Sequence, residues 1–151
     1  MPAETGHILA NLFSELVDGA KAGGGAFILN SGDVGMLSSL DKLSADDASR
    51  SVNDGATIAA HAQHIRYGLS LMNRWAMGDG DPFADAKWDE AWKTSGVNTG
   101  QWDEIRSGLR DEAHRNYGGT TFANRVESAM RMESRLACAR SASRRSLSRL
   151  S

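Results

Sequence analysis

Apolar residues recur at helical spacing near the start of the chain. Within residues 5–20 the apolar positions follow one another at intervals of three and four: Ile8, Leu9, Leu12, Phe13, Leu16 and Val17. This periodicity predicts an amphipathic helix. The glycine-rich segment "GAKAGGG" predicts its end, because glycine tolerates the backbone angles that a helix stop requires. After it, "DVGMLSSLDKL" predicts one or two helical turns, and "SADDASRSVNDGA" predicts a polar loop.

A second long helix is predicted from about Thr57 to Met77, with Thr57 as its N-cap. One row of this helix contains Ile58, His61, Ile65, Leu69 and Met72, and the adjacent row contains His64, Gly68, Leu71 and Trp75. Because both histidines lie in these largely apolar rows, we expect them on the side of the helix that faces the bundle.

In the remaining chain, the residue pattern predicts a long connection followed by two more helices. Residues 78–100 form a long connection that contains Trp88 and Trp92, and connections of this length are often functional or packed as a lid. The next helix begins near Thr99, and its stripe is formed by Trp102, Ile105, Leu109 and Ala113. A fourth helical stretch covers residues 121–140. No stretch alternates as a strand does, so the sequence predicts an all-α four-helix bundle.

The charges divide the chain into two parts. Residues 1–121 carry 10 basic and 17 acidic side chains, whereas residues 122–151 carry 7 arginines and 2 glutamates. We therefore expect a helical bundle over 1–121 and a fourth helix with a basic Arg/Ser-rich tail over 122–151. The acidic bundle argues against a nucleic-acid partner. No stretch resembles a transmembrane helix or a secretion signal. The single cysteine, Cys138, excludes an intrachain disulfide, and we expect a cytoplasmic protein without a membrane partner.

Three interpretations of the tail remain open. It is a basic arm for nucleic acid or another anionic surface, a solvated helix end without a role, or the product of a shifted coding frame near residue 120. The last hypothesis is tested by translating the coding DNA in its other two frames and looking for a histidine-bearing helix.

His61 and His64 are the candidate metal ligands. Imidazole is a common ligand of zinc, nickel and iron, and residues three apart lie on one helix face. The alternative is that both rings only pack and form hydrogen bonds, because two histidines do not complete a metal site. His7 and the "DEAHRNY" segment around His114 are more simply interpreted as surface. The four tryptophans either line a ligand pocket or serve as core and loop anchors, and the second interpretation is favoured.

The segments "GATIAAHAQHIRYGLSLMNRW" and "DPFADAKWDEAWKTSGVNTGQWDEIRSGLRDE" resemble the DinB-like superfamily, including its stress-associated and thiol-transferase-like relatives. The resemblance covers about residues 5–117. It implies a four-helix bundle with up-down-down-up topology, a homodimer, and a divalent metal (Ni, Zn or Fe) held by three histidines. His61 best matches the ligand of the second helix, and His64 is an accessory candidate. Some relatives use the metal to activate a low-molecular-weight thiol for transfer.

The sequence departs from this family after Tyr117. The family's other two ligands come from an HxxxH pair in the fourth helix, and residues 118–151 contain no histidine. Two functions therefore stay open. One is a metal-binding protein related to thiol-dependent transferases or stress-response proteins. The other is a non-enzymatic structural or interaction bundle without a complete metal site.

Overall fold

The structure, a computed structural model, describes residues 2–21, 23, 25–30 and 32–118, together with residues 124 and 128. This part of the chain is helical and contains no strand. Its elements are α1 (Pro2–Asp18), α2 (Gly35–Asp41), α3 (Ala45–Ala48), α4 (Ile58–Ala76), α5 (Trp88–Ala91) and α6 (Thr99–Gly118). The all-α prediction is confirmed for these residues, whereas the predicted helix over 121–140 lies almost entirely outside them.

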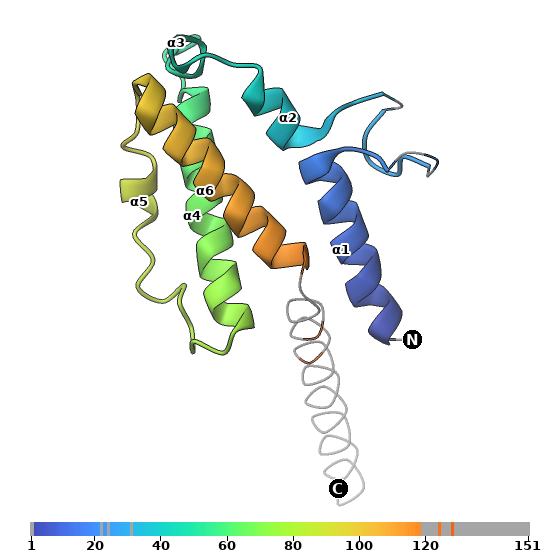
Figure 1. The fold of residues 1–151 in the computed structure, drawn as a ribbon. Coiled ribbons are helices and arrows are strands. Elements are labelled where there is room, and N and C mark those ends of the chain that lie inside the picture. The colour runs from blue at the N-terminus through green and yellow to red at the C-terminus, as the bar shows by residue number, and fades with distance from the viewer. Residues whose placement is uncertain are drawn as a thin grey trace, which may run out of the picture.

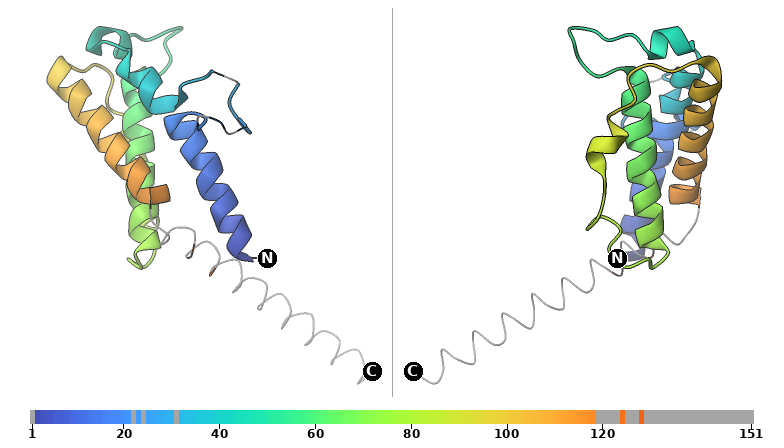
Figure 2. Two further views of the ribbon diagram at one scale, coloured as in Figure 1. Left: turned by 45° about the vertical axis from the view of Figure 1, so that its right-hand side comes forward. Right: turned by 90° about the vertical axis from the view of Figure 1, so that its left-hand side faces the viewer.

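Three long helices dominate the arrangement. α4 and α6 run in the same direction side by side, and α1 runs in the opposite direction next to α6 (Figure 1). Two parallel helices need a connection that returns along their full length, which explains the long segment between Ala76 and Thr99. That segment runs back along α4 and carries α5, on the side of α4 away from α6 (Figure 2).

The core forms where α6 packs against α4 and also against α1 and α2. α6 contributes its predicted stripe, with Trp102, Leu109 and Ala113 at most 1% exposed. The facing side of α4 contributes Ala59, Ala62 and Leu69. Small alanine side chains allow the two helix backbones to approach closely. The Trp102 indole Nε1 donates a hydrogen bond to the carbonyl of Leu43 (2.9 Å), so its polar atom is satisfied inside the core.

The corner between α1 and α2 depends on two glycines with left-handed backbone angles. Gly19 ends α1 at φ +96°, and Gly35 begins α2 at φ +75°. A Cβ at Gly35 would lie 2.7 Å from the carbonyl carbon of Asp18 and still closer to the amide nitrogen of Gly19. Only glycine allows the two backbones to meet here.

Polar contacts connect α6 to each of its long neighbours. The buried Asn73 of α4 donates to the Glu112 carbonyl (2.9 Å) and to its Oε2 (2.7 Å). Near the end of α6, His114 Nε2 lies 3.0 Å from Asp18 Oδ1 of α1. Arg110 reaches Asp41 of α2 at 2.7 Å. The apolar stripes bring the helices together, and these polar contacts fix how the helices are oriented.

Most predicted elements are confirmed within narrow limits. α1, α2, α4 and α6 occupy the predicted stretches, and Thr57 caps α4 by accepting a hydrogen bond from the Ala60 amide (3.2 Å). The prediction of a loop over "SADDASRSVNDGA" was wrong in its first part. Ser44 and Asp47 form a capping box that starts the short helix α3. In the described part of the chain, no helix is long and apolar enough to cross a membrane.

Candidate functional site

The two predicted ligands, His61 and His64, lie against the connection that contains α5. The His64 ring stacks on Trp92, with ring centroids 4.0 Å apart and planes 24° from parallel. The His61 ring meets the same indole edge-on, at 5.0 Å and 89°. Trp88 completes the cluster from the other end of α5, with its ring centroid 5.3 Å from that of His64. We call these four residues the histidine–tryptophan cluster.

The position of the histidines on α4 differs from the expectation. Both were predicted to face the bundle, yet of their two rows only Leu69 is among the buried residues of the core cluster, and Ile58 and Ile65 from the predicted stripe are each 39% exposed. His61 is exposed and His64 half-buried. The expectation was wrong because the α4 face in the core is formed by Ala59, Ala62 and Leu69, and the helix positions of the two histidines lie away from that face.

Further contacts hold the α5 connection on α4. The Lys87 amide donates to the Tyr67 hydroxyl (2.9 Å), and the Tyr67 ring meets Trp88 edge-on at 5.5 Å. The Trp88 indole lies over Gly68, and a Cβ at that position would be in ordinary van der Waals contact with it at 3.6 Å. The tryptophans of the connection therefore act as anchors, as the packing interpretation predicted.

The residues of this cluster and the other described residues do not form a metal centre. A structural zinc site takes four ligands and a catalytic one takes three from the protein. Within the described residues no group of three or more His, Cys, Asp or Glu side chains could hold a metal ion. The His64 Nδ1 atom is buried without a hydrogen-bond partner, but that ring is enclosed by indoles rather than by further ligands. The described residues thus do not fit the three-histidine site that the resemblance implies.

The remaining predicted candidates lie elsewhere. His7 is exposed on α1. His114 is exposed and faces Asp18, so it joins two helices and does not approach the other histidines. Cys138 and the basic tail lie outside the described residues, so the three interpretations of the tail stay open. Trp102 is a core residue and Trp75 is half-buried on α4.

The structure reveals a buried carboxylate that the sequence did not indicate. Glu15 of α1 is 7% exposed, and its side chain accepts hydrogen bonds from the amides of Phe27, Ile28 and Leu29 at 2.8–3.0 Å. These amides, with Leu29 and Ile28 foremost, hold the pKa of Glu15 below its usual range against the opposing effect of burial. Successive amides facing one anion form a backbone nest, which here is occupied by the protein's own carboxylate.

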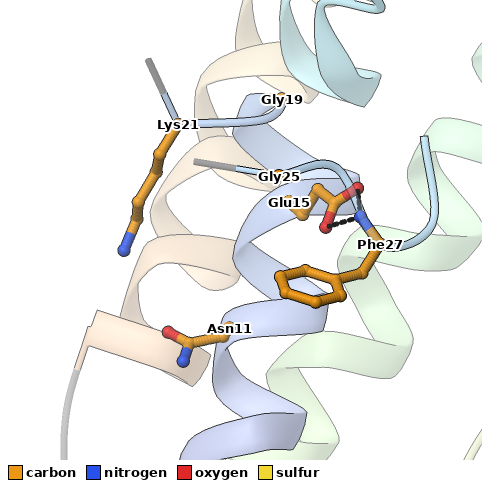
Figure 3. Close-up of a pocket in the computed structure, with 6 residues that line it drawn as sticks. All are labelled: Asn11, Glu15, Gly19, Lys21, Gly25 and Phe27. Carbon is orange, nitrogen blue, oxygen red and sulfur yellow. Dashed lines mark hydrogen bonds between the residues drawn. The ribbon is translucent and has the colours of Figure 1, made fainter. Parts of the chain in front are cut away.

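A cavity of about 320 Å³ lies beside this carboxylate, between α1 and the following loop (Figure 3). Its lining residues include Asn11, Lys21 and Phe27, and Phe27 is 81% exposed. Figure 3 shows the Glu15 carboxylate turned toward the Phe27 amide, so its hydrogen-bonding capacity is directed at the loop. Glu15 therefore holds the loop in its conformation. The cavity lies beside these hydrogen bonds, which have a structural role.

Comparison with known proteins identified no relative of this chain. No protein family, no curated protein and no solved structure matches this chain. The likeness to DinB-like proteins therefore stays a prediction made from the sequence, and the functional argument depends on the chain's own residues.

Proposed function

We propose that this chain is a DinB-like helical bundle that acts by binding other molecules, without a metal centre formed by its described residues. The observation that carries the proposal is the histidine–tryptophan cluster. In it, His64 is stacked on Trp92 and His61 lies edge-on to the same ring. The two histidines hold the α5 connection in place, which is a structural role. Two imidazoles are also fewer ligands than a transition metal needs.

The path of the chain supports the DinB-like topology within this proposal. α1 runs one way and α4 and α6 run the other way, as in the first three helices of an up-down-down-up bundle (Figure 1). The fourth helix of that topology would come from the segment after Gly118. A solution structure of the full chain tests this assignment, and a tail that extends away from α1 and α4 would contradict it.

The part of the proposal that excludes a metal centre is tested directly by metal content. Elemental mass spectrometry of the purified chain, grown with nickel, zinc and iron in the medium, should give well under one metal ion per chain. The His61→Ala variant should give the same value. A near-stoichiometric metal that disappears in this variant would overturn the proposal. The matched control is His7→Ala, because His7 is exposed on a different helix.

Metal binding is the second candidate function, and the exposure of His61 favours it. Its imidazole is at the surface one helical turn from His64, whose Nδ1 atom has no hydrogen-bond partner. A further ligand would have to come from residues outside the described part or from a second copy of the chain. A near-stoichiometric metal in the first experiment supports this candidate, and assays of thiol transfer then become the next step.

The predicted homodimer belongs to the same proposal. Three large apolar side chains of α1 are exposed: Ile8 (56%), Leu9 (41%) and Leu16 (41%). Burying such a stripe against a second copy would remove apolar surface from water. Light scattering should give twice the chain mass, and Leu9→Lys should halve it. Val52→Lys is the matched control, since Val52 is 68% exposed and lies outside α1.

A further inference from the structure

The loop between α3 and α4 contains a turn with an unfavourable backbone conformation. Residues 51–56 are all exposed. Among the described residues, the non-glycine positions with left-handed backbone angles are Asn53 (φ +52°) and Asp54 (φ +57°), which follow each other in this turn. A residue with a Cβ rarely adopts such an angle, although Asn and Asp tolerate it better than most. The chain thus keeps two successive strained residues in a turn that solvent can reach.

Asp54 is followed by Gly55, and an Asp–Gly pair can undergo a reaction without any other reagent than water. The glycine amide nitrogen attacks the side-chain carboxyl carbon of the aspartic acid. A C–N bond forms, the C–O bond to the hydroxyl breaks, and the hydroxyl leaves with the amide proton as one molecule of water. Hydrolysis of the resulting succinimide at the former main-chain carbonyl returns the water. The chain then runs through the side-chain carbon as isoaspartate, and the α-carboxylate is free.

The turn leaves Asp54 available for this reaction. Within the described part of the chain, its carboxylate has no hydrogen-bond or ion-pair partner. Gly55 has no Cβ to hinder the attack on its neighbour. Its amide donates to the Val52 carbonyl (3.0 Å), and the Ser51 hydroxyl donates to the Gly55 carbonyl (2.7 Å). Because these bonds lie in an exposed loop, they open at little cost and release the amide nitrogen.

The first of the other two Asp–Gly pairs, Asp18–Gly19, is held by the end of α1. Asp18 Oδ1 lies 3.0 Å from His114 Nε2 of α6. The Gly19 amide donates to the Glu15 carbonyl (2.8 Å), which is a helix-terminating hydrogen bond. Reaction at this pair requires the last turn of α1 to unwind and the contact with α6 to break.

The remaining pair, Asp79–Gly80, lies in the connection after α4. The Arg74 guanidinium holds the Asp79 carboxylate, with Nε 2.7 Å from Oδ2. This ion pair must break before the carboxyl group can rotate onto the next amide. The three pairs have the same local chemistry, so the fold alone distinguishes them.

We propose that Asp54–Gly55 is a site of spontaneous isoaspartate formation in the folded protein. The isoaspartyl linkage adds one carbon to the main chain and so releases the left-handed angle at residue 54. Its free α-carboxylate stands on an exposed turn, where a repair carboxyl methyltransferase can reach it. In that transfer a carboxylate oxygen takes the methyl group of S-adenosylmethionine, and the sulfonium becomes the thioether of S-adenosylhomocysteine. This modification site is independent of the proposed binding function.

The test incubates the full chain in warm neutral buffer, digests it with trypsin and locates isoaspartate by mass spectrometry with electron-based fragmentation. The three Asp–Gly pairs fall on separate tryptic peptides, residues 1–21, 51–66 and 75–87. Isoaspartate at residue 54 should exceed that at residue 18 and that at residue 79. An equal or greater amount at either of these would overturn the proposal. In denaturant the three amounts should converge. A lead of residue 54 that is unchanged in denaturant would show that the fold does not select the site, and would also overturn it.

Variants separate this site from the other two pairs. Asp54→Glu should remove the modification at residue 54, because the longer side chain would have to close a six-membered ring, which forms much more slowly. Methyl transfer from labelled S-adenosylmethionine to the aged chain should fall strongly in this variant and persist in Asp79→Glu, the matched control. Arg74→Gln should raise isoaspartate at residue 79 in the folded chain, since it frees that carboxylate. If the aged Asp54→Glu chain accepts as much methyl label as the wild type, the proposal fails. Circular dichroism verifies that each variant is folded.

Discussion

The imidazole of His64 on α4 lies stacked on the indole of Trp92, the residue that ends α5, with ring centroids 4.0 Å apart. This contact joins two segments that the chain separates by 28 positions. It explains why a connection of more than 20 residues follows α4 closely, and it gives the histidine pair a use that does not require a metal.

The first prediction concerns this stack. Replacing His64 by Ala should lower the free energy of unfolding by about 1 kcal/mol, because an aromatic pair contributes roughly 0.5–1.5 kcal/mol beyond its buried area. Amide hydrogen exchange of residues 87–93 should accelerate as the connection loosens. His7→Ala should change neither quantity, because His7 is exposed near the start of α1. Unchanged exchange in the His64 variant would show that the stack does not hold the connection.

The second prediction concerns the meeting of α1 and α2. Gly35→Ala should destabilise the protein by more than the roughly 1–2 kcal/mol that a left-handed angle alone costs, because the new Cβ also meets the backbone of Asp18 and Gly19. Chemical denaturation measures the effect. The matched control is Gly25→Ala, where no atom lies within 4 Å of the added Cβ and φ is not positive. Similar losses in both variants would contradict the close approach.

The third prediction is a pH dependence that originates at Glu15. Because three amides lower the pKa of this carboxyl in the folded state, its charged form stabilises the fold at pH values above its ordinary, unfolded-state pKa. This stabilisation is lost as the pH falls through the lowered pKa. Thermal unfolding should therefore show Glu15→Gln several degrees less stable than wild type at neutral pH, with the gap closing in acid. Asp111→Asn, at an exposed position of α6, should show no such closing gap. A gap independent of pH would refute the role of the charge.

The fourth prediction concerns the polar link between α4 and α6. Asn73→Ala removes the two hydrogen bonds to Glu112 and should cost about 1–3 kcal/mol, the penalty for leaving buried polar groups unpaired. Urea denaturation of this variant should be compared with that of Asn11→Ala, because Asn11 is exposed. If the Asn73 variant is as stable as the Asn11 variant, the apolar stripes suffice to set the α4–α6 contact.

Periodicity alone determined the helical nature of this chain and the position of four helices. The α6 stripe was predicted residue by residue, because Trp102, Leu109 and Ala113 are spaced so regularly that only one face can be buried. The end of α1 and the N-cap of α4 followed from glycine and threonine chemistry, which is local. The short helix α3 was missed, because polar residues gave it no stripe and only the Ser44–Asp47 capping box marks it.

Which side of α4 is buried was decided only by the tertiary structure. Of the row that contains Ile58, His61 and Ile65, only Leu69 is buried in the core cluster, where it packs together with Ala59 and Ala62. That choice turned His61 and His64 toward the tryptophans of the α5 connection. The Glu15 nest and the histidine–tryptophan cluster bring together residues from separate segments of the chain. No pattern along one segment encodes them, because such sites exist only once distant segments have been placed side by side.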